Sequence, residues 1–254
     1  MNFSEQELNI IALIWIFFAI FILPLLLKIK APYGRHINKK WGLLIPNKLG
    51  WFIMEVPSLI IILYYFIQNV NIHTRFLILV FLLWIFHYAH RSLFFPFMTR
   101  TKHKKIPLSI VLMGIFFNFV NADLNGYFMS HFFDGQELTP LLTFRFGFGL
   151  FLFVIGMYIN IRADYKLIKL RKTATNGYKI PRGWLFDFIS CPNYFGEILE
   201  WLGFAVIAWN LPALSFFVWT VANLLPRALS NHKWYLENFK DYPKERKALI
   251  PFVL

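Results

Sequence analysis

Long apolar runs separated by short polar segments dominate the chain. Their lengths scatter around the ~20 residues that a helix needs to cross the hydrocarbon core of a bilayer. The runs are Leu8–Leu27, Leu49–Ile67, Phe76–Met98, Ile106–Phe132, Leu141–Ile161, Asn193–Trp209 and Leu211–Leu225. This pattern predicts an all-α, polytopic membrane protein with seven transmembrane helices, in a single domain over residues 1–254.

Two of these runs allow a second interpretation. Only the segment 209–212 (WNLP) separates the last two runs. One bent helix over both would have about 30 residues and would over-span the bilayer, so we predict a tight helical hairpin. The first run could be a signal peptide, but Glu5 and Glu7 precede it and no small-residue cleavage site follows. We therefore interpret it as a span.

The basic residues orient the spans. The chain carries 26 Lys and Arg against 13 Asp and Glu, a formal net charge of +13. Of the basic residues, 23 lie in the segments 28–48, 99–105, 162–182 and 227–254, whereas the connections 68–75 and 133–140 carry only Arg75. The positive-inside rule then predicts that the N-terminus lies outside, or in the lumen, and that the C-terminus is cytosolic.

Composition removes several other classes. Hydrophobic residues make up 58% of the chain and charged residues 15%, whereas soluble domains average roughly 45–50% and about 25%. A pI of 9.8 would suit a nucleic-acid binder. The basic residues, however, lie between apolar runs instead of on an amphipathic surface, so no nucleic-acid partner is expected. The single Cys191 excludes an internal disulfide and a cysteine metal cluster, and no metal site is expected.

Charged side chains inside spans are candidate functional groups, because burying them in lipid is unfavourable. At 1.5 Å per helical residue, Glu55, Tyr88 and Glu197 lie roughly 9, 15 and 6 Å from the cytosolic ends of their spans. Asn160 and Asp164 mark the cytosolic end of a fourth helix. These positions predict a buried polar site that opens to the cytosol.

Polar side chains also recur at helical spacing, as a bound polar ligand would need. The stripes are Asn160, Asp164 and Arg171; Asn193, Glu197 and Glu200; and Arg227, Asn231 and Tyr235. Solvated helix ends, or carboxylates that neutralise Arg91 or Arg145, are the alternative explanation. A deeper stripe indicates interhelical hydrogen bonding: Asn118, Asn121 and Asn125.

Short motifs extend over nearly the whole chain. The densest part, from 145 to the end, holds 156–161 (GMYINI), 192–201 (PNYFGEILEW), 241–244 (DYPK) and 246–252 (RKALIPF). Upstream stand 33–36 (YGRH), 55–58 (EVPS), 87–91 (HYAHR) and 124–127 (LNGY). Together they resemble the steroid 5α-reductase family, most closely its type 2 isoenzyme. The chain departs from the family pattern in two places: Met54 replaces a frequent Gln, and Ser230–Asn231 replace histidines.

The resemblance implies an oxidoreductase that reduces the 4,5 double bond of 3-oxo-Δ4-steroids, or a similar lipophilic enone, with NADPH. It implies that Glu55 and Tyr88 hold the substrate ketone and that Trp201 forms a wall of the substrate cavity. It further implies that the NADPH site is formed by Tyr33, Arg35, Arg91, Lys102, Asn160, Asp164, Arg171, Tyr178, Asn193, Glu197, Arg227, Asn231 and Tyr235. Such a protein is expected to be a monomer in the endoplasmic reticulum or the bacterial inner membrane, with its cofactor site facing the cytosol.

Hydride addition to an enone places negative charge on the carbonyl oxygen, so catalysis needs a proton donor there. The phenol of Tyr88 suits this role. A neutral Glu55 would donate to the same oxygen and an ionised one would orient Tyr88; both alternatives stay open. Other functions also stay open: an isoprenylcysteine-type methyltransferase that uses S-adenosylmethionine, a reductase of enoyl-thioester, polyprenol or sterol substrates, and a non-enzymatic lipid-binding or channel protein.

Overall fold

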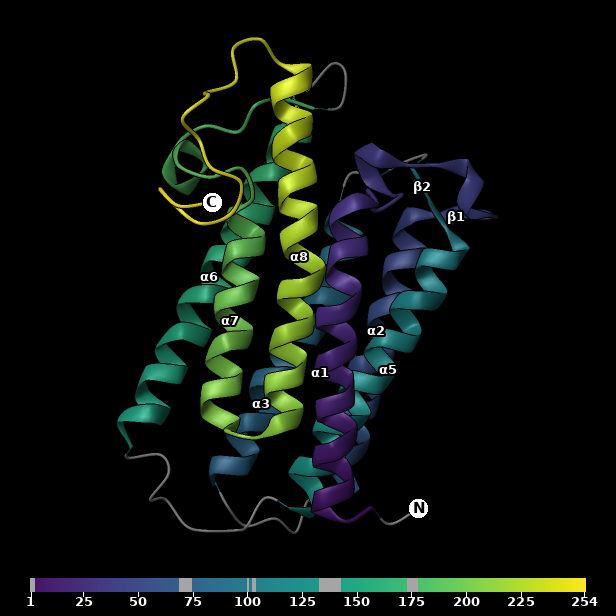
Figure 1. The fold of residues 1–254 in the computed structure, drawn as a ribbon, viewed down its shortest axis with the longest axis vertical. Coiled ribbons are helices and arrows are strands. Elements are labelled where there is room, and N and C mark those ends of the chain that lie inside the picture. Colours follow the sequence, from purple (N-terminus) through teal and green to yellow (C-terminus); the bar gives the residue numbers. More distant parts are fainter. Residues whose placement is uncertain (1–2, 69–74, 100, 102–103, 133–142, 173–177) are drawn as a thin grey trace.

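Helices make up most of the protein. The computed structural model describes all residues except 1–2, 69–74, 100, 102–103, 133–142 and 173–177. Its α-helices are α1 (Glu5–Lys28), α2 (Asn47–Gln68), α3 (Arg75–Ala89), α4 (Phe95–Met98), α5 (Leu108–His131), α6 (Phe144–Lys172), α7 (Pro192–Ala208) and α8 (Leu211–Asn238). A π-helical turn, η3 (His90–Phe94), joins α3 to α4, and short 3-10 turns are η1 (Gly34–His36), η2 (Lys39–Trp41) and η5 (Trp184–Asp187). The long helices form one bundle (Figure 1).

Six helical segments in the described part of the chain are long and apolar enough to cross a bilayer. They are Glu5–Lys28, Asn47–Gln68, Arg75–Met98, Leu108–His131, Phe144–Arg171 and Leu211–Asn238. The remaining predicted span is α7, which has only 17 residues and a length of about 25 Å. A multi-pass, mostly helical membrane protein is therefore confirmed, whereas the seven-span count and the orientation of the termini stay predictions.

The distribution of side chains is that of a protein solvated by lipid. Large apolar side chains face outward, with Phe21 81% and Phe144 87% exposed. Polar side chains lie inside, including Asn118, Asp164 and Glu200. In water such an arrangement would be unfavourable on both counts, so it supports the assignment of the bundle to a membrane.

Several helix boundaries differ from the predicted ones. Helix α6 continues to Lys172 and α8 to Asn238, well past the predicted ends at Ile161 and Leu225. The apolar pattern marks contact with lipid, and both helices continue beyond that zone as polar segments. The predicted start at Leu141 lies outside the described residues.

The all-α prediction is wrong in one local feature. β1 (Leu44–Pro46) and β2 (Lys105–Pro107) pair antiparallel, with Ile45 opposite Ile106. This pairing joins the segment before α2 to the segment before α5. Strands of three residues are too short to show the alternation that identifies a strand in a sequence.

A sharp turn separates α7 from α8, as predicted (Figure 1). Trp209 ends α7 in the left-handed conformation, with φ of 51°. Asn210 then caps α8, because its side-chain oxygen accepts a hydrogen bond from the amide of Ala213 at 2.8 Å. The helical hairpin is therefore confirmed.

Close backbone contact joins α6 to α7. A Cβ atom added to Gly156 would lie 2.4 Å from the backbone nitrogen of Glu200, and one added to Gly203 would lie 2.4 Å from that of Phe153. Small residues allow such close approach of membrane helices. The glycines at this contact are Gly149, Gly156, Gly196 and Gly203.

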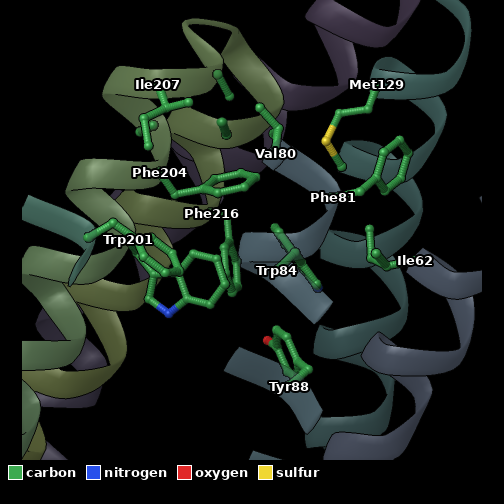
Figure 2. Close-up of a cluster of buried hydrophobic side chains, with 14 of the residues drawn as sticks. Ile62, Val80, Phe81, Trp84, Tyr88, Met129, Trp201, Phe204, Ile207 and Phe216 are labelled. Atoms are coloured by element: carbon green, nitrogen blue, oxygen red, sulfur yellow. The ribbon is translucent and has the colours of Figure 1, made fainter. Parts of the chain in front are cut away.

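An aromatic core lies between α3, α7 and α8 (Figure 2). Trp84 from α3 lies 4.9 Å from Trp201 of α7, and Trp201 lies 4.4 Å from Phe216 of α8, measured between ring centroids. Tyr88 lies at the edge of this core, stacked on Trp84 at 5.6 Å. The core therefore gives Tyr88 a rigid apolar support.

The described parts of all four basic segments lie at one end of the bundle, the upper end in Figure 1. Helix α1 begins at the opposite end, and the segment after α8 lies at this basic end, together with β1 and β2. The fold thus separates an apolar helix bundle from a basic end that is formed by loops and helix ends.

Candidate active site

Arg91, on the π-helical turn η3, lies at the centre of the candidate site. Three carboxylates from three other helices face its guanidinium. Glu55 of α2 lies 4.0 Å away, Asp164 of α6 3.4 Å and Glu197 of α7 3.6 Å. None of these four side chains is more than 14% exposed. We call these residues the Arg91 cluster; π-helical turns are frequent at functional sites.

The sequence allowed two explanations for the buried carboxylates: they form a ligand site, or they neutralise an arginine. The Arg91 cluster is compatible with both. The predicted site residues converge from four helices, and three of the carboxylates also face a buried arginine. A lone guanidinium beside three carboxylates leaves excess acceptor capacity. The cluster is therefore able both to hold the helices together and to accept hydrogen bonds from a ligand.

Two asparagines extend the cluster between α6 and α7. The amide of Asn160 donates to Glu197 Oε2 and to the backbone oxygen of Asn193, both at 3.0 Å. The amide of Asn193 donates to Asp164 Oδ1 at 2.9 Å. The glycine contact between the two helices brings these side chains within reach, because it allows α6 and α7 to lie this close.

Asn118 links the two predicted catalytic residues. The Tyr88 hydroxyl donates to Asn118 Oδ1 at 3.0 Å, and the Asn118 amide donates to Glu55 Oε2 at 3.2 Å and to the Met54 oxygen at 2.7 Å. The sequence assigned Asn118 only to interhelical hydrogen bonding, which it does make. Its position beside Tyr88 was not apparent, because depth estimates placed it at or beyond the midplane.

Trp201 is placed beside Tyr88, with ring centroids 6.0 Å apart. Its side chain is 1% exposed and packs against Trp84, Phe204 and Phe216 of the aromatic core (Figure 2). Trp201, predicted to face the substrate, therefore lies inside the aromatic core and in contact with the Tyr88 ring in this structure.

A buried pair next to Trp201 was not predicted. His87 Nδ1 lies 2.7 Å from Glu200 Oε1, and both side chains are buried. Glu200 Oε2 is buried without a hydrogen-bond partner among the described residues. The sequence placed Glu200 on a polar stripe or next to an arginine, whereas the structure pairs it with His87.

Cationic and aromatic side chains form a second group at the basic end. The guanidinium of Arg35 lies 4.9 Å from the ring centroid of Tyr178, 4.5 Å from that of Trp234 and 4.6 Å from that of Tyr235. It also donates to the Tyr235 hydroxyl at 3.4 Å. Arg171 lies 5.8 Å from the Tyr178 ring. We call Arg35, Arg171, Arg227, Tyr178, Trp234 and Tyr235 the outer group.

Two aromatic rings connect the outer group to the Arg91 cluster. Arg227 lies 5.3 Å from the centroid of the Tyr33 ring, and Tyr33 packs edge-on against Trp51 at 6.0 Å. The Trp51 centroid lies 5.2 Å from the Arg91 guanidinium. Tyr33 and Trp51 thus form a line of ring contacts from Arg227 to Arg91, which we call the polar path.

Asn231 and Cys191 lie at the edge of this path. The Asn231 amide donates to Cys191 Sγ at 3.8 Å. Burial raises the pKa of the Cys191 thiol to about 12. Burial, followed by the charges of Arg35 and Lys30, lowers the pKa of His36. The predicted cofactor residue Lys102 lies outside the described residues.

The C-terminal motif supports the outer group from behind. Tyr242 stacks on Tyr235 with centroids 5.1 Å apart, and its hydroxyl lies 2.7 Å from Ser190 Oγ. Arg246, 2% exposed, donates to the oxygen of Pro181 at 3.1 Å. Tyr242 therefore supports Tyr235 directly, whereas Arg246 ties the C-terminal segment to Pro181.

The outer group fits a ligand that carries phosphates. Arg35, Arg171 and Arg227 form no ion pair within the described residues, and Arg35 Nη1 is buried without a hydrogen-bond partner. A guanidinium group without an ion-pair partner can donate two parallel hydrogen bonds to two oxygens of one phosphate. The adjacent rings offer stacking surfaces for a planar base. Among the described residues, no group of His, Cys, Asp or Glu is arranged to hold a metal ion.

The fold and the site define a multi-pass membrane protein with cationic and aromatic side chains at its basic end and a buried polar cluster inside the bundle. Comparison with known proteins then identifies the family. A sequence model of the family 3-oxo-5-alpha-steroid 4-dehydrogenase matches residues 104–254, which is more than half of the chain. The chain therefore belongs to the 3-oxo-5-alpha-steroid 4-dehydrogenase family and is an oxidoreductase that acts on CH–CH groups.

Individual relatives agree with this assignment. The chain is 43% identical over 229 residues to steroid 5-alpha-reductase DET2 of Gossypium hirsutum, covering 89% of both chains. It is 41% identical over 234 residues to 3-oxo-5-alpha-steroid 4-dehydrogenase 1 of Rattus norvegicus, covering 88% of this chain and 86% of the relative. These relatives are plant and type 1 enzymes, so the similarity to the type 2 isoenzyme stays a prediction.

Proposed function

We propose that this protein reduces the 4,5 double bond of a 3-oxo-Δ4-steroid with NADPH, and that Tyr88 and Glu55 engage the substrate ketone. Beyond family membership, one observation carries the proposal: Asn118 joins the phenol of Tyr88 to the carboxyl of Glu55 at the inner end of the polar path. Tyr88 is 3% exposed and the side chain of Glu55 12% exposed, which supports a role for both groups at one substrate carbonyl oxygen.

The reaction adds one hydride and one proton across the double bond. As hydride reaches the β-carbon, the electron pair of the double bond shifts toward the carbonyl oxygen. Tyr88 then donates its hydroxyl hydrogen bond to that oxygen instead of to Asn118. Glu55 either donates to the same oxygen or orients Tyr88 through Asn118. A proton from water finally adds to the α-carbon of the enolate, which restores the ketone and completes the reduction.

NADPH supplies the hydride when it is bound. Arg35, Arg171 and Arg227 would hold its phosphates, and the rings of Tyr33, Tyr178 and Tyr235 would pack against its planar groups. Asn160, Asn193, Asp164 and Glu197 offer donors and acceptors for its amide and ribose hydroxyls. Asn231 borders this region and Arg91 orders its inner end. Lys102 is proposed as a further contact.

The substrate side of the site is apolar. The aromatic core, with Trp201 inside it, gives the site an apolar surface next to Tyr88 (Figure 2). A flat lipophilic enone suits such a surface, because burying its apolar area contributes roughly 25 cal/mol per Å². We place the basic end in the cytosol, where NADPH is available, and the protein in the endoplasmic reticulum or a bacterial inner membrane, as a monomer.

The test is reduction of a Δ4-3-ketosteroid in membranes supplied with NADPH. Glu55→Gln and Tyr88→Phe should each lower kcat on the order of 10²–10³-fold, as the loss of one donor to a developing oxyanion does, and should leave NADPH affinity near that of the wild type. Tyr64→Phe is the matched control, because Tyr64 is 56% exposed on the same helix as Glu55. Full activity of both site variants would refute the roles.

Two alternative functions can be distinguished from this one by measuring which cofactor binds and which substrate is reduced. Family membership favours a reductase over an isoprenylcysteine-type methyltransferase; binding of S-adenosylmethionine without NADPH would reverse that preference. An enoyl-thioester, polyprenol or sterol enone would be reduced with the same residues, and competition between such a compound and the steroid would identify the preferred substrate.

A further inference from the structure

A cavity of about 1520 Å³ lies between the start of α2, the segment from α4 to β2, and the last turns of α6. The charged residues in its described lining are all lysines: Lys48, Lys104, Lys105, Lys166 and Lys169. Its apolar lining includes Phe97, Met98 and Ile168. The cavity therefore combines positive charge with an apolar wall.

The charges of these lysines are not neutralised by the protein. Lys48 Nζ donates to the backbone oxygen of Phe97 at 3.2 Å, and Lys166 Nζ donates to that of Gly183 at 3.0 Å. Lys104 Nζ donates to the Tyr178 hydroxyl at 3.1 Å. In the part of the chain that the structure describes, none of the lining lysines takes part in an ion pair. Such a cavity attracts an anion.

The cavity adjoins the proposed cofactor path but does not include its central polar residues. Asp164 faces that path, and Ile168, one turn later and about 40° further around the helix axis, lines the cavity. Lys104, which also lines the cavity, donates to the Tyr178 hydroxyl of the outer group. Neither Asp164 nor Asn160 is among the described lining residues.

The position of the cavity indicates what kind of anion it takes. It lies at the ends of helices that are apolar along their spans, which is the level of the phosphate groups in a bilayer. Phe97, 58% exposed, borders it. Its volume exceeds the ~300–1,000 Å³ of ordinary ligand pockets, so it can take a head group together with the beginning of the acyl chains. Basic pockets between membrane helices bind anionic lipids in this way.

We propose that this cavity binds the head group of an anionic phospholipid from the leaflet at the basic end. The lysines contact the phosphate, and the apolar wall contacts the adjoining glycerol and acyl carbons. The bound lipid would connect α2, α4 and α6 at the end of the bundle where the cofactor path opens. This role is independent of the reductase chemistry.

The proposal is tested with the purified full chain in a neutral detergent. Dioctanoyl phosphatidylserine, dioctanoyl phosphatidylcholine and inorganic pyrophosphate are titrated, and bound lipid is counted by native mass spectrometry. The combined variant Lys48→Gln, Lys105→Gln and Lys169→Gln should weaken binding of phosphatidylserine at least roughly tenfold. The matched control, Lys39→Gln, Lys240→Gln and Lys244→Gln, removes the same charge from exposed positions outside the cavity and should bind as the wild type does.

Three results would overturn the proposal: unchanged phosphatidylserine binding by the cavity variant, equal binding of pyrophosphate or phosphatidylcholine, or displacement of the lipid by NADPH. A second measurement needs no variant and holds even if the cavity variant does not fold. Photo-crosslinkable phosphatidylserine should label wild-type peptides that contain Met98 or Ile168. Labelling confined to other peptides would also refute the assignment.

Discussion

The contact between α6 and α7 makes a specific prediction for Gly156→Ala. The added Cβ would lie 2.4 Å from the Glu200 nitrogen, 2.6 Å from the Gly196 oxygen and 2.8 Å from the Glu200 Cα, whereas ordinary contacts begin at 3.4 Å. These three nearest atoms all belong to the backbone, so a side-chain rotation cannot relieve the clash. The helices must separate by about 1 Å, and forced overpacking of this kind destabilises by about 1–3 kcal/mol.

The same separation should disturb the cofactor path. Asn160 lies one turn after Gly156, and its two hydrogen bonds to α7 are 3.0 Å long. An additional ~1 Å takes both beyond hydrogen-bond range. We therefore expect the midpoint of thermal unfolding in detergent to fall by several degrees and the NADPH affinity to fall roughly tenfold, because positioning errors of this size weaken binding and catalysis strongly.

Gly147→Ala on the same helix is the matched control. An added Cβ there meets nothing within 4 Å, so stability should stay the same or rise by up to about 1 kcal/mol, the helix preference of Ala over Gly. Wild-type thermal midpoint and NADPH affinity in Gly156→Ala would refute the reasoning. Equal losses in both variants would show that the effect does not come from the close contact.

Three further outcomes are expected. Asn118→Leu should lower kcat about 10²-fold with little change in NADPH affinity, because Tyr88 and Glu55 lose their common partner; unchanged turnover would exclude that link. Arg91→Met should destabilise the protein by about 3–5 kcal/mol, since it leaves three buried carboxylates without their cation, whereas Arg91→Lys should retain part of this stability; thermal unfolding of the two variants compares them. Cys191 should react with iodoacetamide at pH 8 about 10³-fold more slowly in the folded protein than in denaturant, because burial raises its pKa to about 12; mass spectrometry follows the modification, and rapid labelling of the folded form would contradict the buried position.

The sequence by itself determined the class of environment and most of the helices. Apolar runs such as Leu8–Leu27 have to be solvated by lipid, and a helix is the element that satisfies its own backbone there. Basic residues gather in alternate connections, which predicts one basic end. The turn at Trp209 and Asn210 was also readable, because one helix over both runs would be too long for a bilayer.

The tertiary structure alone decided how the polar residues meet. A helical stripe shows that Asn160 and Asp164 share a face, but not that Arg91 from another helix lies against Asp164 and Glu197. Asn118 and His87 gained their partners only when α2, α3, α5 and α7 came together. Periodicity reports which face of a helix is polar, whereas the partner of that face depends on packing between helices far apart in the chain.

The cavity and the glycine contact show the same division. The five lysines that line the cavity belong to segments that the sequence predicts to be cytosolic. Their common cavity exists only because β1 pairs with β2 and α6 extends past the apolar zone. Gly156 alone reads as a weak position in a helix. Its need for close backbone contact appears only with α7 beside it, because long-range packing sets that distance and local sequence does not.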